Sequence, residues 1–101
     1  MQAPEEIYLP HVDANSEHVK IIRISSPDII LVTPGDVILE FETSKAAIEL
    51  PAQKSGFVKI LVKENDEIEP GQVVALWSAH QDLFYSSRAV NIKQLFLVPN
   101  S

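Results

Sequence analysis

The chain has 101 residues, of which 46% are hydrophobic and 22% charged, enough for one small globular core but not for a second. Eight basic against fourteen acidic residues give a formal charge of -6, which disfavours general attraction to nucleic acid or anionic membranes and favours protein partners. The absence of cysteine excludes disulfides and thiolate chemistry.

The first ten residues, MQAPEEIYLP, lack the basic segment and apolar run of a signal peptide. No apolar stretch approaches the ~18 residues of a membrane-spanning helix. We therefore expect an interior, cytoplasmic protein.

The segment PHVDANSEH, residues 10–18, predicts a polar surface loop. Its histidines, His11 and His18, and the distant His80 are scattered without metal-ligand spacing, so no metal site is predicted. His18 is expected to face solvent at the start of the following strand.

After this loop the chain repeats itself. HVKII, which starts at His18, returns 39 residues later as FVKIL, and PGDVILEF, which starts at Pro34, returns 36 residues later as PGQVVALW. Gly35 and Gly71 each follow a proline, where a Pro-Gly step favours a tight turn. Each copy therefore predicts a strand, a turn and a strand.

Around these turns, apolar residues recur at every second position, the period of a half-buried strand. Neither copy can bury its apolar face alone, so the two should pack together. We predict an all-β fold, a flattened β-barrel or sandwich of two four-stranded sheets related by a pseudo-twofold axis. The predicted core positions include Val37, Leu39, Phe41, Val58, Ile60, Val62 and Trp77, which aligns with Phe41 in the repeat.

One hairpin joins the two copies. Strands predicted over 36–42 and 46–50 leave Thr43, Ser44 and Lys45 at its tip, with the Lys45 amine in solvent. Ala46 and Ala47 add no bulk beside it, so an enzyme or partner can approach closely. An ordinary solvated lysine would look the same from the tip alone, so the interpretation depends on the wider pattern.

That wider pattern resembles a known family. The stretch GDVILEFETSKAAIELPAQKSGFVKILVKENDEIEPGQVVAL is similar to the lipoyl domain of dihydrolipoyl acyltransferases in 2-oxo acid dehydrogenase complexes, of the biotinyl/lipoyl barrel-sandwich hybrid type. The likeness covers roughly residues 6–79. It rests on the hairpin, on PAQKSG at 51–56 and on the internal repeat.

The resemblance implies which residues matter. In this family the lysine of an E-T-D-K-A-like hairpin tip is amidated by lipoic acid, and the matching residue is Lys45. Glu42, Ser44, Ala46 and Gly56 match positions expected to influence recognition by the modifying enzyme. No catalytic or metal-binding residue is implied.

The resemblance also implies a carrier that shuttles acyl groups and reducing equivalents on a swinging arm. The expected partners are a lipoate ligase or lipoyltransferase and the dehydrogenase, acyltransferase and dihydrolipoyl dehydrogenase components of such a complex. A protonated lysine is a poor nucleophile, so a separate enzyme must deliver the activated acyl group. A chain excised from a eukaryotic protein would belong to the mitochondrial matrix.

Several departures keep alternatives open. The family usually has an acidic residue where Ser44 stands, and two extra residues lie between Asp28 and Gly35 compared with Asp66 to Gly71. The main alternative is an unmodified interaction or scaffold module. A biotin carrier is disfavoured because its family flanks the lysine with methionines, whereas the only methionine here is Met1. The glycine cleavage H protein is similar in fold but longer, and no nucleophile and base pair suggests an independent enzyme.

Two segments lie outside the best match. The loop at 10–18 is expected to contact partners beside the lysine hairpin. Residues 80–101 extend past the predicted domain, 1–79, and contain IKQLFLV, which is too apolar for a free linker. This extension is expected to be an extra strand over a sheet edge, a segment that binds another chain, or a linker into a larger protein.

Overall fold

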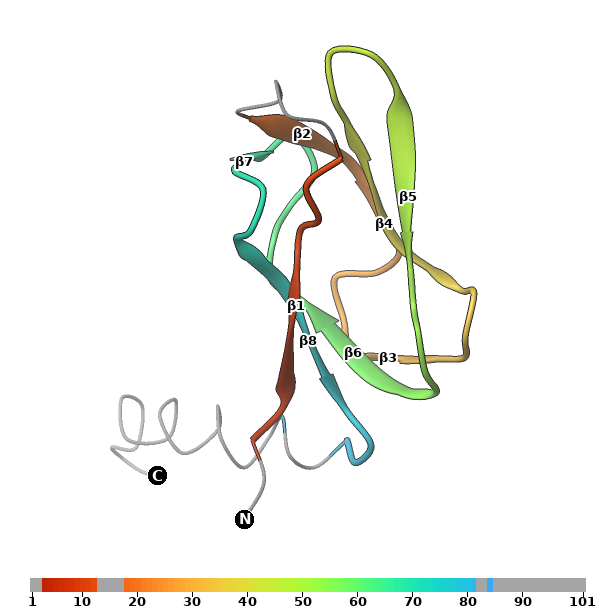
Figure 1. The fold of residues 1–101 in the computed structure, drawn as a ribbon. Helices are drawn as coiled ribbons and strands as arrows, with labels where there is room; N and C mark the ends of the chain where they lie inside the picture. Colours follow the sequence, from red (N-terminus) through yellow and green to blue (C-terminus); the bar gives the residue numbers. More distant parts are fainter. Residues whose placement is uncertain (1–2, 13–17, 82–83, 85–101) are drawn as a thin grey trace, which may run out of the picture.

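The computed structural model describes residues 3–12, 18–81 and 84. Within them the regular elements are β-strands, which confirms the predicted all-β class (Figure 1). None of the described elements is a helix long and apolar enough to cross a membrane. The strands are β1 Glu5–Tyr8, β2 Val19–Ile24, β3 Ile30–Val32, β4 Val37–Glu42, β5 Ala47–Pro51, β6 Gly56–Ile60, β7 Glu67–Ile68 and β8 Val73–Ser78.

The strands form two four-stranded antiparallel sheets. One has the order β1-β8-β6-β3 and the other β5-β4-β2-β7. Each strand of the first sheet corresponds to the strand four positions away in the chain: β1 to β5, β8 to β4, β6 to β2 and β3 to β7. The two sheets are therefore related by the predicted pseudo-twofold axis, as the internal repeat of the sequence implies. Each sheet contains strands from both copies of the repeat.

The two Pro-Gly steps form matching turns. Gly35 and Gly71 both have φ of 93°, a left-handed value that favours glycine. The amide of Asp36 donates to the Thr33 carbonyl at 3.0 Å, and that of Gln72 to the Glu69 carbonyl at 3.1 Å. The predicted tight turns are confirmed, down to their hydrogen bonds.

The core lies between the sheets. Phe41, Val58 and Val74 are fully buried, and Ile60 and Val62 are nearly so. The second copy alternates as predicted, since the alternate positions Lys59, Leu61 and Lys63 are half-buried or exposed. Burial of such a side chain contributes roughly 1.5–3 kcal/mol, so this core accounts for most of the favourable folding energy.

The alternation prediction is wrong at the start of β4, where Val37, a predicted core position, is only half-buried. Ile38, expected to face outward, is as buried as Leu39, with 1% exposed for both. The register between β4 and β5 shifts between Val37 and Leu39, and such a bulge turns two consecutive side chains toward one face. Ile38 therefore joins the core.

The β4–β5 turn and the end of β8 lie at opposite ends of the molecule (Figure 1). β8 ends at Ser78, close to the predicted domain boundary at residue 79, which stays a prediction. Apart from residues 80, 81 and 84, the C-terminal extension lies outside the described residues.

Candidate functional site

Lys45 occupies the tip of the hairpin formed by β4 and β5, at one end of the barrel (Figure 1). The last paired residues of the hairpin are Glu42 and Ala47, and Phe41 pairs with Ile48 just below them. Because Phe41 is fully buried, the strands beneath the tip are anchored in the core. The sequence prediction of a lysine presented at a hairpin tip agrees with this geometry.

Thr43 fixes the shape of the turn. Its amide donates to the Ala46 carbonyl at 2.8 Å, and its hydroxyl oxygen accepts from the amides of Lys45 and Ala46, each at 3.1 Å. The same hydroxyl lies 3.3 Å from the Ala46 carbonyl, to which it can donate. Thr43 is only 7% exposed, so this network holds the tip from beneath.

The role of Thr43 was missed from the sequence, which placed it at the tip with Ser44 and Lys45. The available signal was its type, since a threonine hydroxyl can bond to backbone groups two or three residues away and so close a turn. The structure instead makes Thr43 a buried support and leaves Ser44, Lys45 and Ala46 exposed.

No ion pair joins the Lys45 amine to either glutamate of β4, both of which are described residues. Glu40 is paired instead with Arg23 of β2, with 2.9 Å between Oε1 and Nη2. Glu42 is exposed and precedes the turn on the outward face of β4. The amine of Lys45 is thus accessible to a second protein without a salt bridge having to be broken.

Of the four predicted recognition residues, three gather at the tip and one does not. Glu42, Ser44 and Ala46 flank Lys45 and are exposed. Gly56 begins β6, beyond the far end of β5, and is buried. A role for Gly56 in recognition stays a prediction, and burial means that any such effect would act through the fold.

The surroundings of Gly56 give it a packing role. It has φ of 156°, and a Cβ placed on it would lie 2.4 Å from Nε1 of Trp77. The indole therefore lies directly against the Gly56 backbone. Trp77 is half-buried, so the expectation that it is a core residue like Phe41 holds only in part: it packs against the core and also lines an open crevice.

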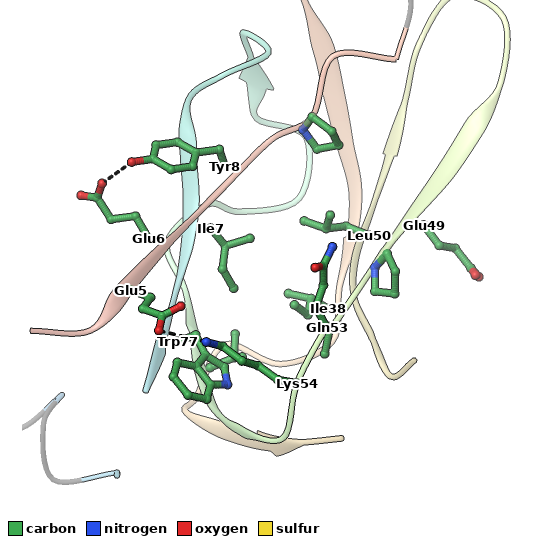
Figure 2. A pocket seen from close by; sticks show the side chains of 14 residues that line it. Glu5, Glu6, Ile7, Tyr8, Ile38, Glu49, Leu50, Gln53, Lys54 and Trp77 are labelled. Carbon is green, nitrogen blue, oxygen red and sulfur yellow. Dashed lines mark hydrogen bonds and ion pairs between the residues drawn. The ribbon is translucent and has the colours of Figure 1, made fainter. Parts of the chain in front are cut away.

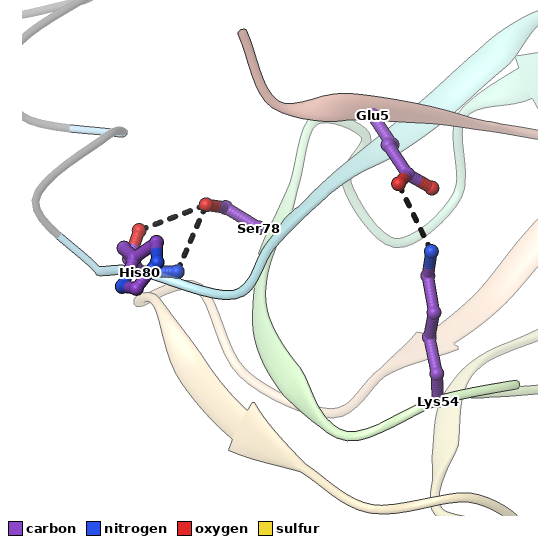
Figure 3. A network of polar contacts seen from close by, with 4 residues as sticks. All are labelled: Glu5, Lys54, Ser78 and His80. Carbon is purple, nitrogen blue, oxygen red and sulfur yellow. Dashed lines mark hydrogen bonds and ion pairs between the residues drawn. The ribbon is translucent and has the colours of Figure 1, made fainter. Parts of the chain in front are cut away.

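Figure 2 shows this crevice between β1 and β5, with a cavity volume of about 680 Å³. At one end the ammonium of Lys54 lies 4.1 Å from the centre of the Trp77 ring and 2.9 Å from a carboxylate oxygen of Glu5 (Figures 2 and 3). This contact links the 51–56 segment to β1. No local sequence pattern indicates this contact, because only the fold brings Lys54 to Trp77.

The chain leaves β8 through a turn closed by a hydroxyl. Ser78 Oγ accepts from the His80 amide at 3.0 Å and donates to the His80 carbonyl at 2.9 Å (Figure 3). Ser78 is 2% exposed. Both β4 and its repeat counterpart β8 are thus followed by a turn organised by a buried hydroxyl group.

The partner loop expected at 10–18 is tested only at its margins, since residues 13–17 lie outside the described residues. His18 is exposed, as predicted, and its Nε2 lies 3.9 Å from a carboxylate oxygen of Glu69. A contact role for this loop stays a prediction.

Comparison with known proteins identifies the family of the chain and confirms the resemblance found in the sequence. A family model described as biotin-requiring enzyme, the biotin/lipoyl model, matches residues 19–76. The chain is 32% identical over 80 residues to dihydrolipoyllysine-residue acetyltransferase component 2 of the pyruvate dehydrogenase complex, mitochondrial, from Arabidopsis thaliana, covering 77% of this chain and 15% of the relative. It is 31% identical over 74 residues to component 3 from the same plant, covering 71% of this chain and 14% of the relative. The chain thus spans about a seventh of the length of either relative.

Proposed function

The chain belongs to the biotin/lipoyl family, and from this we propose that it is a carrier domain to which lipoic acid is joined through an amide at Nζ of Lys45. The observation that carries the proposal is the position of this amine. It is exposed, free of ion pairs among the described residues, and held at the tip of a rigid hairpin.

The residues of the tip fit a covalently attached group. An amide requires an amine that a modifying enzyme can surround, and Ala46 and Ala47 leave the space beside Lys45 open. The Thr43 hydrogen bonds keep the turn in one shape, so the enzyme meets a preorganised target. When bound, the lipoyl group would supply redox and acyl-transfer chemistry, while the protein would supply its position.

The chain itself acts as a carrier rather than as an enzyme in this proposal. Residues 1–79 form the carrier domain, which moves acyl groups and reducing equivalents between separate active sites. Attachment to a mobile arm raises the effective concentration of the carried group at each site.

The relatives suggest the partners. Both are named as acetyltransferase components of the pyruvate dehydrogenase complex, and both are named as mitochondrial. We therefore place this chain in a 2-oxo acid dehydrogenase complex, with its dehydrogenase, acyltransferase and dihydrolipoyl dehydrogenase as partners. A lipoate ligase or lipoyltransferase would modify it, in the mitochondrial matrix or the cytoplasm according to its source.

The test is the intact mass of the chain after co-expression with a lipoate ligase in medium supplied with lipoate, followed by peptide mapping of residues 40–54. We expect one lipoyl group on Lys45. Lys45→Arg should abolish the modification, whereas the matched variant Lys54→Arg should be modified like the wild type. Modification of Lys45→Arg at another lysine would refute the site.

Two other outcomes distinguish the alternatives. A biotin-sized mass gain with a biotin ligase, but none with the lipoate ligase, would identify a biotin carrier. No gain with either enzyme would favour the unmodified interaction module, the alternative that Ser44 supports because it replaces the usual acidic neighbour of the lysine.

A further inference from the structure

The crevice between β1 and β5 is a gap between two sheet edges. Each strand is the last of its sheet, so its outer edge has no strand partner among the described residues. Unpaired strand edges are sites where an extended segment can add. Apolar side chains line the interior of this gap: Ile7, Ile38, Leu50, Val58 and Trp77 (Figure 2).

The rim of the crevice is acidic. Three of the residues that border it are acidic, Glu5, Glu6 and Glu49, and one is basic, Lys54. Lys54 is already paired with Glu5, and Glu6 accepts a hydrogen bond from the Tyr8 hydroxyl at 2.7 Å. The crevice therefore suits an occupant that is apolar and carries positive charge.

One segment of the chain has this composition. All fourteen acidic residues lie at or before Asp82, whereas 83–101 contain no acidic residue, two basic residues and an apolar run from Leu95 to Val98. Four residues, 79–82, separate this segment from Ser78, and Ser78 directly follows Trp77, which lines the crevice. The last of the described residues lie at the end of the molecule where β1 begins (Figure 1).

We propose that residues 85–101 of this chain dock in the crevice between β1 and β5 of the same molecule. In this arrangement the apolar run from Leu95 to Val98 covers Trp77 and its neighbours, and Arg88 and Lys93 face the rim carboxylates. Reach is no obstacle, because seventeen extended residues span up to about 56 Å, whereas the four residues of β1 extend only about 13 Å. The extension thereby closes the free edges of both sheets.

The first test locates the extension by paramagnetic labelling. The chain lacks cysteine, so Asn91→Cys and Ser101→Cys each accept a single spin label on the full-length protein. We expect loss of amide NMR signal from β1 and β5, at Ile7 and Leu50, and retention at Leu31 of β3. Retained signals at Ile7 and Leu50 would overturn the proposal.

A mixed sample separates docking within one chain from docking between copies. Spin-labelled chain of natural isotope content is combined with ¹⁵N-enriched chain that carries no spin label. Any broadening of the ¹⁵N amide signals must then arise between molecules. We expect no broadening in this mixture. Equal broadening in both samples would mean that the crevice holds the extension of a second copy and would overturn docking within the chain.

The second test uses Trp77, the only tryptophan, as a reporter. Leu97→Asp should increase acrylamide quenching of its emission, because an aspartate cannot remain in an apolar, acid-rimmed crevice. The matched control is Leu31→Asp, at an exposed leucine of β3 away from the crevice, which should leave quenching unchanged. Equal quenching of Leu97→Asp and wild type would overturn the proposal. Neither test depends on Lys45, so both can be made on unmodified protein.

Discussion

Replacement of Gly56 by alanine should destabilise the fold through Trp77. A Cβ at this position would lie 2.4 Å from Nε1, 2.6 Å from Cε2 and 2.7 Å from Cζ2 of the indole. All three atoms belong to a rigid ring, which cannot yield by rotating a flexible end. The ring must move as a whole, and Lys54 lies over its face.

Two costs add in Gly56→Ala. The φ of 156° is a value that residues with a Cβ rarely adopt, at a cost of order 1–3 kcal/mol. Overpacking against the indole adds typically about 1–3 kcal/mol. The free energy of unfolding should therefore fall by about 2–6 kcal/mol in total, a large part of the 5–15 kcal/mol typical of a whole domain.

The assay is urea unfolding followed by far-ultraviolet circular dichroism, with Gly35→Ala as the matched control. Gly35 also has a left-handed φ, of 93°, but nothing lies within 4 Å of a Cβ placed there. The control therefore measures the backbone cost, and the difference between the variants measures the clash. In thermal unfolding followed by the same signal, the melting temperature of Gly56→Ala should be at least about 4 °C below that of Gly35→Ala.

A double variant tests whether the indole is the cause. In a Trp77→Leu background the flat ring is absent, so Gly56→Ala should cost little more than Gly35→Ala does. Equal destabilisation by the two glycine variants in the wild-type background would refute the reasoning, because the ring would then move away freely. An undiminished difference in the Trp77→Leu background would refute it as well.

Three further predictions concern side chains outside the core. Thr43→Val should destabilise by about 1–3 kcal/mol and speed hydrogen exchange of the two turn amides, whereas Thr43→Ser should not, because only valine lacks the hydroxyl. Lys54→Met should cost at most about 2 kcal/mol, since an exposed ion pair and a cation–π contact each contribute up to about 1 kcal/mol. It should also shift the fluorescence emission of Trp77, which Lys54 contacts. The pKa of Tyr8 is raised above its usual 10.0 by the hydrogen bond to Glu6, then by the Glu6 charge and by burial. Glu6→Gln should lower that pKa in an NMR titration of the Tyr8 ring, and an unchanged value would exclude Glu6 as the cause.

The pH sign of the Tyr8 effect follows from linkage. The folded-state pKa lies above the unfolded value, so the contribution is complete below about pH 10 and is lost as pH rises through the folded pKa. At neutral pH the contribution is fully present, so Glu6→Gln should remove it there. Because Tyr8 does not titrate near neutral pH, the pH dependence of stability in that range should be the same in both proteins.

The architecture could be predicted because the same strand-turn-strand pattern occurs twice in the sequence. The repeat specified two equivalent units, and the Pro-Gly turns and the period-two alternation specified strands within each. The failures occur where the copies differ. The bulge that buries Ile38 depends on pairing with β5, and no local pattern encodes it.

In the candidate site, too, the features set by local sequence were predictable and those set by contacts between distant residues were not. The position of Lys45 follows from the hairpin, which is local, and so was predictable. The contact of Gly56 with Trp77 joins residues 21 apart in sequence, and the crevice exists only once both sheets are in place. The repeat aligned Trp77 with Phe41, but an indole exceeds a phenyl ring in size, and the structure accommodates it beside a glycine at the crevice rather than wholly in the core.

The pseudo-twofold relation explains why the fold offers a single tip of this kind. β4 continues through the Lys45 turn into β5, its neighbour in the sheet, whereas β8 is paired with β1, from which it is separated by most of the chain. The place symmetry-related to the lysine turn is therefore where the chain enters β1 and leaves β8. Because that place lies at the opposite end of the molecule, any chain attached there leaves the tip unobstructed (Figure 1). The carrier role proposed for this chain would need this separation, since the modified lysine would have to enter the active sites of other proteins while the domain stays tethered.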